Sequence, residues 1–395
     1  MLTILAGLSL LAWLYLLLAR GFFWRIVSLD TARFPAARPW PEVAAIIPAR
    51  NEAGLIGGAV RSLLDQRYPG QLMIVVIDDH SDDSTAAVAA ESARSVGRGE
   101  DVRVIAARPL PDGWTGKLWA LSEGVHEAER GLPTASYLWF TDADIEHGPE
   151  VLRFLAARAV AEDLDLASLM VELPGRGIAE QLLLAPFVFF FRKLYPFAWV
   201  NDPRRRTAAA AGGCLLVRPQ ALARAGGLAP IAGALIDDCA LASLIKAKGR
   251  PGGGRIWLGL TRAAHSRRDY GGINGIWRMV ARSAYTQLGH SPLLLVGTLA
   301  AMLVAYLVPP LVVLAWPVHG QWGAGLIGLA AWLVMSATIW PTLRYYGQST
   351  AFAPLLPIAA CLYCAMTLDS AFAHMRGRGG AWKGRTGTHL ASAED

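Results

Sequence analysis

Residues 42–165 alternate short apolar runs with amphipathic segments, and this alternation constrains the fold more than any other feature of the chain. Strands are expected at 43–47, 72–77, 102–106 and 137–140, with helices between them at 58–66, 84–96 and 118–128. Strands that alternate with helices build a mostly parallel sheet covered by helices on both faces, so the pattern predicts an α/β domain. Ligands of such sheets bind beyond the carboxyl ends of the strands.

Acidic residues follow two of the predicted strands. Asp78 and Asp79 end the second strand, and Asp142 and Asp144 come directly after the run 137–140. Two carboxylates one residue apart at a strand end can bind one divalent cation, Mg²⁺ or Mn²⁺, which can also bind phosphate oxygens of a substrate. An isolated Asp-x-Asp pair is also common in solvated loops and helix caps. The acidic neighbours favour the metal site here.

A third acidic pair lies further along the chain. Asp237 and Asp238 begin a helical pattern after the small-residue run 230–234. Unsatisfied N–H groups at a helix start stabilise a carboxylate, and an ionised carboxylate can act as a general base toward an attacking hydroxyl. Simple N-capping is the alternative interpretation of this pair.

The composition favours a membrane protein with a soluble part, since 54% of the residues are hydrophobic and only 17% are charged. Residues 2–19 carry no charge, and Arg20 and Arg25 follow them. We therefore expect a transmembrane anchor over residues 1–22, with the N-terminus outside and residues 40–290 in the cytoplasm. A cleaved signal peptide is the alternative, but it would need a basic start and a clear cleavage site.

Three further apolar runs predict C-terminal membrane helices over residues 291–373, followed by a basic tail over 374–395. Pro309 and Pro310 should kink or break the first run. Four simple spans would place the C-terminus outside, whereas the basic tail favours the cytoplasm, and the sequence leaves this conflict open.

Residues 178–206 are predicted to form a membrane-interface element, because charged side chains and prolines interrupt their apolar pattern. A buried core helix is the alternative for the apolar part. The run 204–206 is three arginines, which suit lipid phosphates or a solvated basic turn. The net charge of +6 comes mainly from basic residues beside apolar runs, which favours membrane orientation and not nucleic-acid binding.

Taken in order, these motifs resemble the family 2 glycosyltransferases of GT-A fold. The motifs are the runs 46–52, 75–81 and 113–117, Asp142-Ala143-Asp144, Gly212-Gly213-Cys214 and Asp237-Asp238. They are most similar to the membrane-bound, ceramide-glucosyltransferase-like branch, and within it to the hopene-associated glycosyltransferases of bacterial hopanoid clusters. The resemblance covers roughly residues 40–290 and the flanking membrane segments.

The resemblance implies roles for individual residues. It places the nucleotide at Glu52 and Asp79, with Asp78 as a near alternative, and adds Pro48 and Asn51 to the substrate-binding loop. It implies that Lys117 binds the donor near its diphosphate, that Asp142 and Asp144 bind metal and diphosphate, and that Asp238 is the catalytic base beside Asp237. Of the later Q-x-x-R-W motif only Arg282 remains, which the resemblance adds to the substrate-binding residues, and processive polymer synthesis is not implied.

The function implied is that of an inverting hexosyltransferase in the bacterial cytoplasmic (inner) membrane, with the catalytic domain facing the cytoplasm. It would move a sugar from a nucleotide-sugar, by family habit a UDP-sugar, to a lipid hydroxyl such as that of a hopanoid. A glycerolipid or a polyprenyl phosphate is the alternative acceptor. A non-catalytic nucleotide-binding membrane protein is a further alternative, which the three acidic pairs disfavour.

Overall fold

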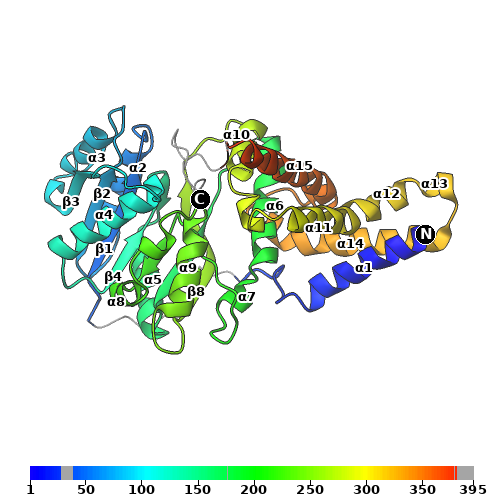
Figure 1. Ribbon diagram of the computed structural model, residues 1–395, viewed down its shortest axis with the longest axis horizontal. Coiled ribbons are helices and arrows are strands. Elements are labelled where there is room, and N and C mark those ends of the chain that lie inside the picture. The colour runs from blue at the N-terminus through cyan, green and yellow to red at the C-terminus, as the bar shows by residue number, and fades with distance from the viewer. Residues whose placement is uncertain (28–38, 176, 378, 380–395) are drawn as a thin grey trace, which may run out of the picture. The chain divides into compact units, whose positions relative to one another are not determined.

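The computed structural model describes residues 1–27, 39–175, 177–377 and 379, and it divides into two compact units (Figure 1). The sheet unit contains the described residues of 28–174 and 199–269. The helical unit contains those of 1–27, 175–198 and 270–380. Most of the predicted basic tail, 374–395, lies outside the described residues.

The sheet unit is built on one sheet of eight strands in the order β3-β2-β1-β4-β7-β6-β8-β5. The strands are β1 (Val43–Ala49), β2 (Leu72–Asp78), β3 (Val102–Ala106), β4 (Tyr137–Phe140), β5 (Ile145–His147), β6 (Leu166–Glu172), β7 (Leu215–Val217) and β8 (Ile256–Ser266). The predicted strands at 102–106 and 137–140 are confirmed to the residue, and the other two extend one or two residues further.

Helices flank this sheet: α2 (Ile56–Leu64), α3 (Thr85–Arg94), α4 (Gly116–Gly131), α5 (Val151–Ala161), α8 (Pro219–Arg224) and α9 (Asp237–Lys248). All seven residues of β1 are buried, as expected for a central strand covered on both faces. The sheet is mixed: β7 runs antiparallel to both β4 and β6, and β5 runs antiparallel to β8, whereas the other neighbouring pairs are parallel, as the sequence predicted for most of the sheet. These reversed strands come after the alternating region from which the parallel sheet was predicted.

The carboxyl ends of β1, β2 and β4 meet at one edge of the sheet, because these three strands are parallel. The chain runs from β1 outward to β2 and β3 and then returns to place β4 on the other side of β1. Such a reversal of strand order opens a crevice beyond the strand ends, where ligands of open α/β sheets bind. The loops 48–52, 78–81 and 141–144 all lie at this edge.

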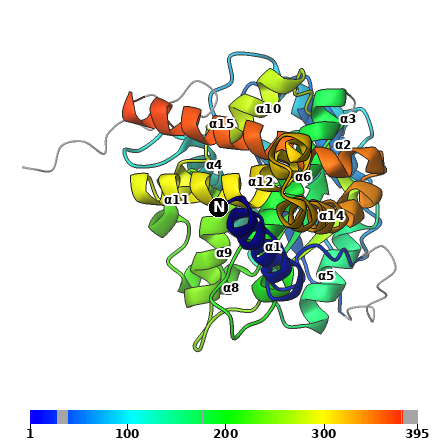
Figure 2. The ribbon, with the colours of Figure 1, turned by 90° about the vertical axis from the view of Figure 1, so that its right-hand side faces the viewer.

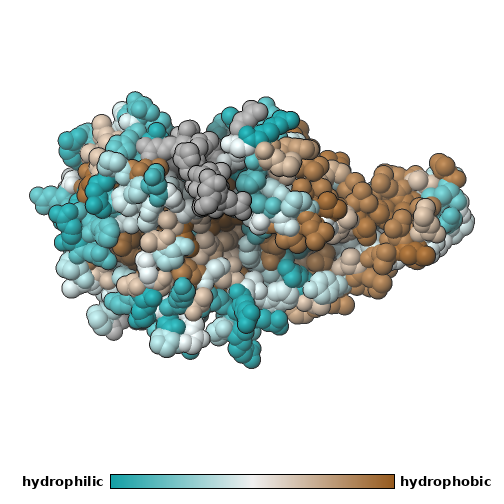
Figure 3. All heavy atoms as spheres, viewed as in Figure 1, coloured by the Kyte–Doolittle hydropathy of each residue, from teal (hydrophilic) through white to brown (hydrophobic). Residues whose placement is uncertain are grey.

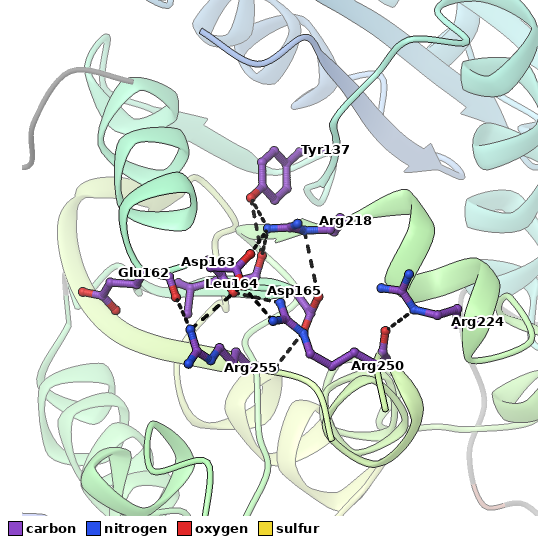
Figure 4. Close-up of polar contacts among 10 residues, drawn as sticks. Tyr137, Glu162, Asp163, Leu164, Asp165, Arg218, Arg224, Arg250 and Arg255 are labelled. Atoms are coloured by element: carbon purple, nitrogen blue, oxygen red, sulfur yellow. Dashed lines mark hydrogen bonds and ion pairs between the residues drawn. The ribbon is translucent and has the colours of Figure 1, made fainter. Parts of the chain in front are cut away.

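An ion-pair cluster lies where β6 and β8 begin and β7 ends (Figure 4). Asp165 is 1% exposed and accepts from Arg250 Nε at 2.6 Å and from the Arg255 N–H at 2.8 Å. Asp163 pairs with Arg218 at 2.9 Å and with Arg250 Nη1 at 2.8 Å. A buried carboxylate is tolerated only when charge and hydrogen bonds compensate it, so this cluster holds the three chain segments together.

The helical unit consists of apolar helices: α1 (Leu2–Leu18), α6 (Ile178–Leu194), α10 (Ile273–Ala281), α11 (Pro292–Met302), α12 (Val308–Leu314), α13 (Trp316–His319), α14 (Trp322–Tyr345) and α15 (Leu356–Met375). The short α7 (Phe197–Val200) follows α6. Helix α1 runs beside α14, as Figures 1 and 2 show. On the face drawn in Figure 3, hydrophobic residues gather over the apolar helices, whereas the sheet unit is largely hydrophilic.

Helix α1 has two distinct faces. Ala6, Ser9 and Trp13 are fully buried, whereas Ile4 and Leu8 are 69% and 50% exposed. An apolar side chain that points outward along a helix suits a lipid environment. Four stretches of the described residues are long and apolar enough to cross a membrane: Ile178–Val200, Pro292–Leu314, Trp322–Tyr345 and Thr350–Met375. Helix α1 is apolar but shorter, at 17 residues.

The two prolines expected to kink or break the first C-terminal run lie in the first turn of α12, directly after a π-helical turn over Leu303–Leu307. The helical path continues through this turn. Pro309 has no N–H to offer the carbonyl of Ala305, four residues earlier. The indole Nε1 of Trp13 donates to that carbonyl instead, at 2.6 Å, so the proline creates the acceptor that ties α1 to this helix.

Candidate active site

A cleft lies beyond the carboxyl ends of β1 and β4. It has about 310 Å³ of empty volume, including open solvent. Its lining includes residues from five segments that are distant in the sequence: Pro48, Lys117, Asp142, Gly212, Asp237 and Asp238. The sheet edge thus brings together residues that the sequence assigned to separate motifs.

Lys117 is the central charge of this cleft. Thr115 caps α4 by accepting from the Leu118 N–H, which places Lys117 in the first turn of the helix. Its Nζ lies 2.9 Å from Asp142 Oδ1 and 3.1 Å from Asp237 Oδ2. Burial opposes the charge on Lys117, but the neighbouring carboxylates outweigh it and raise the pKa of the ammonium group above its ordinary value. Lys117 is therefore a fixed positive charge.

Asp238 lies at the start of α9, where two backbone N–H groups hold its carboxylate. Oδ1 accepts from the N–H of Cys239 at 2.7 Å, and Oδ2 accepts from the N–H of Gly212 at 2.9 Å. A side chain at Gly212 would place a Cβ 3.1 Å from Lys117 Nζ, so glycine allows the backbone this close approach.

The environment of Asp238 tunes its acidity toward neutral pH. Removal from water, and next the charge of Asp237, raise the pKa of Asp238 to about 6, against the opposing effect of Lys117. A carboxylate with a pKa near the operating pH suits a general base, since it is ionised yet still able to hold a proton.

Asp144 is held by a different set of groups. Its Oδ2 accepts from Ser266 Oγ at 2.6 Å and from Arg268 Nε at 3.2 Å. The other arm of the same guanidinium, Arg268 Nη2, lies 2.7 Å from Glu52 Oε1. Asp142 and Asp144 therefore each have a protein cation as partner, Lys117 and Arg268 respectively.

The donor set fits a divalent cation that is shared with a substrate. Asp142 and Asp144 offer carboxylate oxygens, the ligands that Mg²⁺ and Mn²⁺ prefer, and both already attract positive groups. Across the described residues, no three His, Cys, Asp or Glu side chains converge on one metal position. Mg²⁺ is commonly bound by one or two carboxylates together with substrate phosphates. When bound, the ion would neutralise charge on a phosphate group.

A buried histidine, His147, holds the start of the loop that carries Asp142 and Asp144. His147 Nε2 lies 2.8 Å from Thr141 Oγ1, and that hydroxyl donates to the carbonyl of Gly213 at 2.9 Å. Burial, with a contribution from His265, lowers the pKa of His147 to about 3, so the imidazole is neutral and donates from Nε2. The two hydrogen bonds hold the start of the acidic loop against the 211–214 segment.

The loops after β1 and β2 form the other side of the edge. Ser81 Oγ donates to Asp78 and accepts from the N–H of Asn51 at 3.0 Å. Asp79 is fully buried, with its carboxylate 3.8 Å from Arg50. Glu52 is 7% exposed, and its N–H donates to Thr85 Oγ1 at 2.8 Å. The residues expected to contact a nucleotide are thus held in one network at adjacent strand ends.

Comparison with known families and structures agrees with this geometry. Residues 44–221 match the family described as glycosyl transferase family 2. Over these residues the chain is similar to the family 2 glycosyltransferases. The match ends before Asp237, Asp238 and Arg268, which the fold of the glycosyltransferase brings back to the same edge. No curated protein sequence matches the chain.

The chain is also similar to solved structures. The mannosyltransferase PcManGT from Pyrobaculum calidifontis, solved with GDP-Man and Mn²⁺, is 20% identical, with a TM-score of 0.56 over 95% of this chain and 99% of that one. Glucosyl-3-phosphoglycerate synthase from Mycobacterium tuberculosis, solved with Mn²⁺, UDP and phosphoglyceric acid, is 18% identical, with a TM-score of 0.44 over 67% of this chain and 85% of that one. The likeness to PcManGT establishes the GT-A fold of the glycosyltransferase.

Most predicted site residues lie at this edge, but one belongs elsewhere. Arg282 follows α10 in the helical unit, and its expected role in substrate binding stays a prediction. Three residues of the site had no role predicted from the sequence: Arg268 and Ser266, which bind Asp144, and His147, which supports the acidic loop. The sequence signal for Arg268 is a pair of adjacent arginines, Arg267 and Arg268, that follows the apolar run 256–260.

Proposed function

We propose that the enzyme moves a sugar from a nucleoside-diphosphate sugar to the hydroxyl group of a membrane lipid, with a divalent cation and with inversion at the anomeric carbon. The observation that carries this proposal is the position of Lys117 between Asp142 and Asp237, with Asp238 beside them in one cleft. A fixed cation next to a metal-binding carboxylate suits a diphosphate leaving group.

In this proposal Asp238 takes the proton from the acceptor hydroxyl. The bond from the acceptor oxygen to the anomeric carbon forms as the bond from that carbon to the diphosphate oxygen breaks, and the nucleoside diphosphate leaves. The raised pKa of Asp238, about 6, supports its role as the base. Asp237 is bound to Lys117, which supports a positioning role for that carboxylate.

The helical unit supports a lipid acceptor, because it supplies apolar helices of membrane-spanning length. Helix α6 is one of them, but β6 before it and β7 after it pair in one sheet. Both ends of α6 must therefore lie on the same side of a membrane, which supports an interface element over 178–206 and not a single crossing. We propose spans at α1 and in the three C-terminal stretches, with the sheet unit in the cytoplasm, as Arg20 and Arg25 favour.

The donor nucleotide and the acceptor are the open choices within this function. The resemblance of the motifs favours a UDP-sugar, whereas PcManGT was solved with GDP-Man and Mn²⁺, so both nucleotides belong in the test. A hopanoid is the acceptor we propose, and a glycerolipid or a polyprenyl phosphate is the alternative.

The test uses the full-length protein in lipid nanodiscs with Mn²⁺ or Mg²⁺. UDP-hexoses and GDP-mannose are supplied with a hopanoid, a diacylglycerol or a polyprenyl phosphate, and products are identified by mass spectrometry. We expect one glycolipid whose anomeric configuration, read by NMR, is opposite to that of the donor, and no product with chelator. Retained configuration would contradict inversion, and donor turnover without any glycolipid would contradict a lipid acceptor. Lipid profiles of a deletion strain should show one lost glycolipid and its accumulated precursor.

A further inference from the structure

Arg268 connects two carboxylates that the proposed function assigns to different parts of the donor. Its Nε lies 3.2 Å from Asp144 Oδ2, on the metal side, and its Nη2 lies 2.7 Å from Glu52 Oε1, on the nucleotide side. One planar guanidinium therefore bridges both carboxylates at once.

Both carboxylates are buried beside this cation. Glu52 and Asp144 are 7% and 8% exposed, and neutral groups such as Ser266 Oγ cannot balance their charge. Like charges in a poorly solvated site repel each other and resist ionisation. Arginine stays protonated in proteins, so Arg268 is a permanent countercharge for the pair.

The backbone holds Arg268 in register with Asp144. Strand β5 pairs with the end of β8 through Ile145 and Ser266, and the N–H of Arg267 donates to the carbonyl of Asp144 at 2.8 Å. Arg267, the preceding residue, has a different partner, since its Nε lies 2.7 Å from Glu146 and its side chain is 47% exposed. Two adjacent arginines thus have the same charge and separate roles.

A divalent cation that arrives alone meets an unfavourable site. It competes with the positive charge of Arg268 for Asp144, and the described residues supply no third acidic, His or Cys ligand to complete its shell. A cation that arrives with a diphosphate brings further oxygen ligands, and the diphosphate gives the released guanidinium a new anionic partner.

We propose that Arg268 couples metal binding to donor binding: it neutralises Glu52 and Asp144 while the site is empty and transfers to the diphosphate when metal and donor enter together. The inference rests on the proposed function. It makes Arg268 a donor-binding residue that keeps the affinity for metal low until the donor is present. Because such coupling is reciprocal, the loss of Arg268 must weaken the effect of donor on metal and of metal on donor equally.

The experiment measures Mn²⁺ binding to the full-length protein in nanodiscs by electron paramagnetic resonance, without nucleotide and with saturating UDP or GDP. For Arg268→Ala we expect donor-free Mn²⁺ affinity to rise by about tenfold, because the positive charge that repels the metal ion is lost. A nearby charge that shifts a pKa by about one unit has an effect of the same size. Nucleotide affinity at saturating Mn²⁺ should fall by about the same factor. Arg267→Ala is the matched control, because it removes the same charge one residue away, and it should leave both affinities unchanged.

The possible results distinguish a failure of the proposed donor site from a failure of the role of Arg268. If wild type binds Mn²⁺ no better with UDP or GDP than without, the proposed donor site is wrong. If wild type shows the coupling but Arg268→Ala matches Arg267→Ala, the role of Arg268 alone is overturned. Should Arg268→Ala fail to fold by circular dichroism, Arg268→Lys decides the question: it keeps the charge but cannot bridge both carboxylates, so the same two changes are expected at smaller size.

Discussion

The pH dependence of transfer tests the assignment of Asp238 as the base. A base works only when deprotonated, so kcat/KM for the acceptor should fall as the pH drops through the pKa of Asp238, about 6. A group with that pKa is roughly nine-tenths ionised at pH 7 and one-tenth ionised at pH 5, which predicts a loss of about tenfold between them. Asp238→Asn should remove this acidic limb of the pH–rate profile and lower kcat by ~10²–10⁴.

Two neighbouring substitutions should move the acid limb in opposite directions. Lys117 lowers the pKa of Asp238, so Lys117→Gln should shift the midpoint upward by about 1 unit, the low end for an opposite charge within ~4–6 Å. Asp237 raises the pKa of Asp238, so Asp237→Asn should shift the midpoint downward. Glu100→Gln is the control: it removes an exposed carboxylate of the turn Gly99–Asp101 and should leave the midpoint of the acidic limb unchanged.

The assay is the initial rate of nucleoside diphosphate release that depends on lipid acceptor, at saturating donor and metal over about pH 5 to pH 9. Opposite shifts in the Lys117 and Asp237 variants, together with loss of the limb in Asp238→Asn, would tie the limb to Asp238. Shifts of the same sign would refute the reasoning. Near-normal turnover in Asp238→Asn together with a dead Asp237→Asn would make Asp237 the base.

Three further predictions follow from the site and the fold. Asp144→Ala should abolish metal-dependent nucleotide-sugar binding in calorimetry with and without chelator, and normal binding by the folded variant would contradict Asp144 as a metal ligand. A cysteine at the exposed position of Glu100 should resist impermeant thiol reagents in intact cells and react after lysis, whereas labelling in intact cells would reverse the proposed orientation. Arg250→Ala should destabilise the sheet unit by about 2 kcal/mol, less than a fully buried pair because Arg250 is 24% exposed. Arg255→Ala removes a more exposed arginine, and an equal fall in melting temperature there would argue against a special role for the buried Asp165 pair.

The parallel half of the sheet and its acidic edge were predictable because both depend on local pattern. Short apolar runs such as 43–47 and 137–140 have the length and burial of central strands, and the residues directly after them must lie at the carboxyl edge. The acidic pairs at 78–79 and 142–144 were therefore found by position alone. The reversed strands β5 and β7 have only three residues each, too few for a periodic signal.

The partners of these residues depended on the tertiary structure. Lys117 and Asp237 belong to different helices that meet only across the folded cleft, and Glu52 and Arg268 are 216 residues apart. Spacing along the chain carries no information on such pairs, because the loop between them is long and the contact is set by the register of the sheet. The raised pKa of Asp238 likewise arises from enclosure and from charges on other segments. Sequence determined which chemical groups stand at the strand ends, and tertiary structure decided which charges neutralise one another, because electrostatic interaction depends on distance in space.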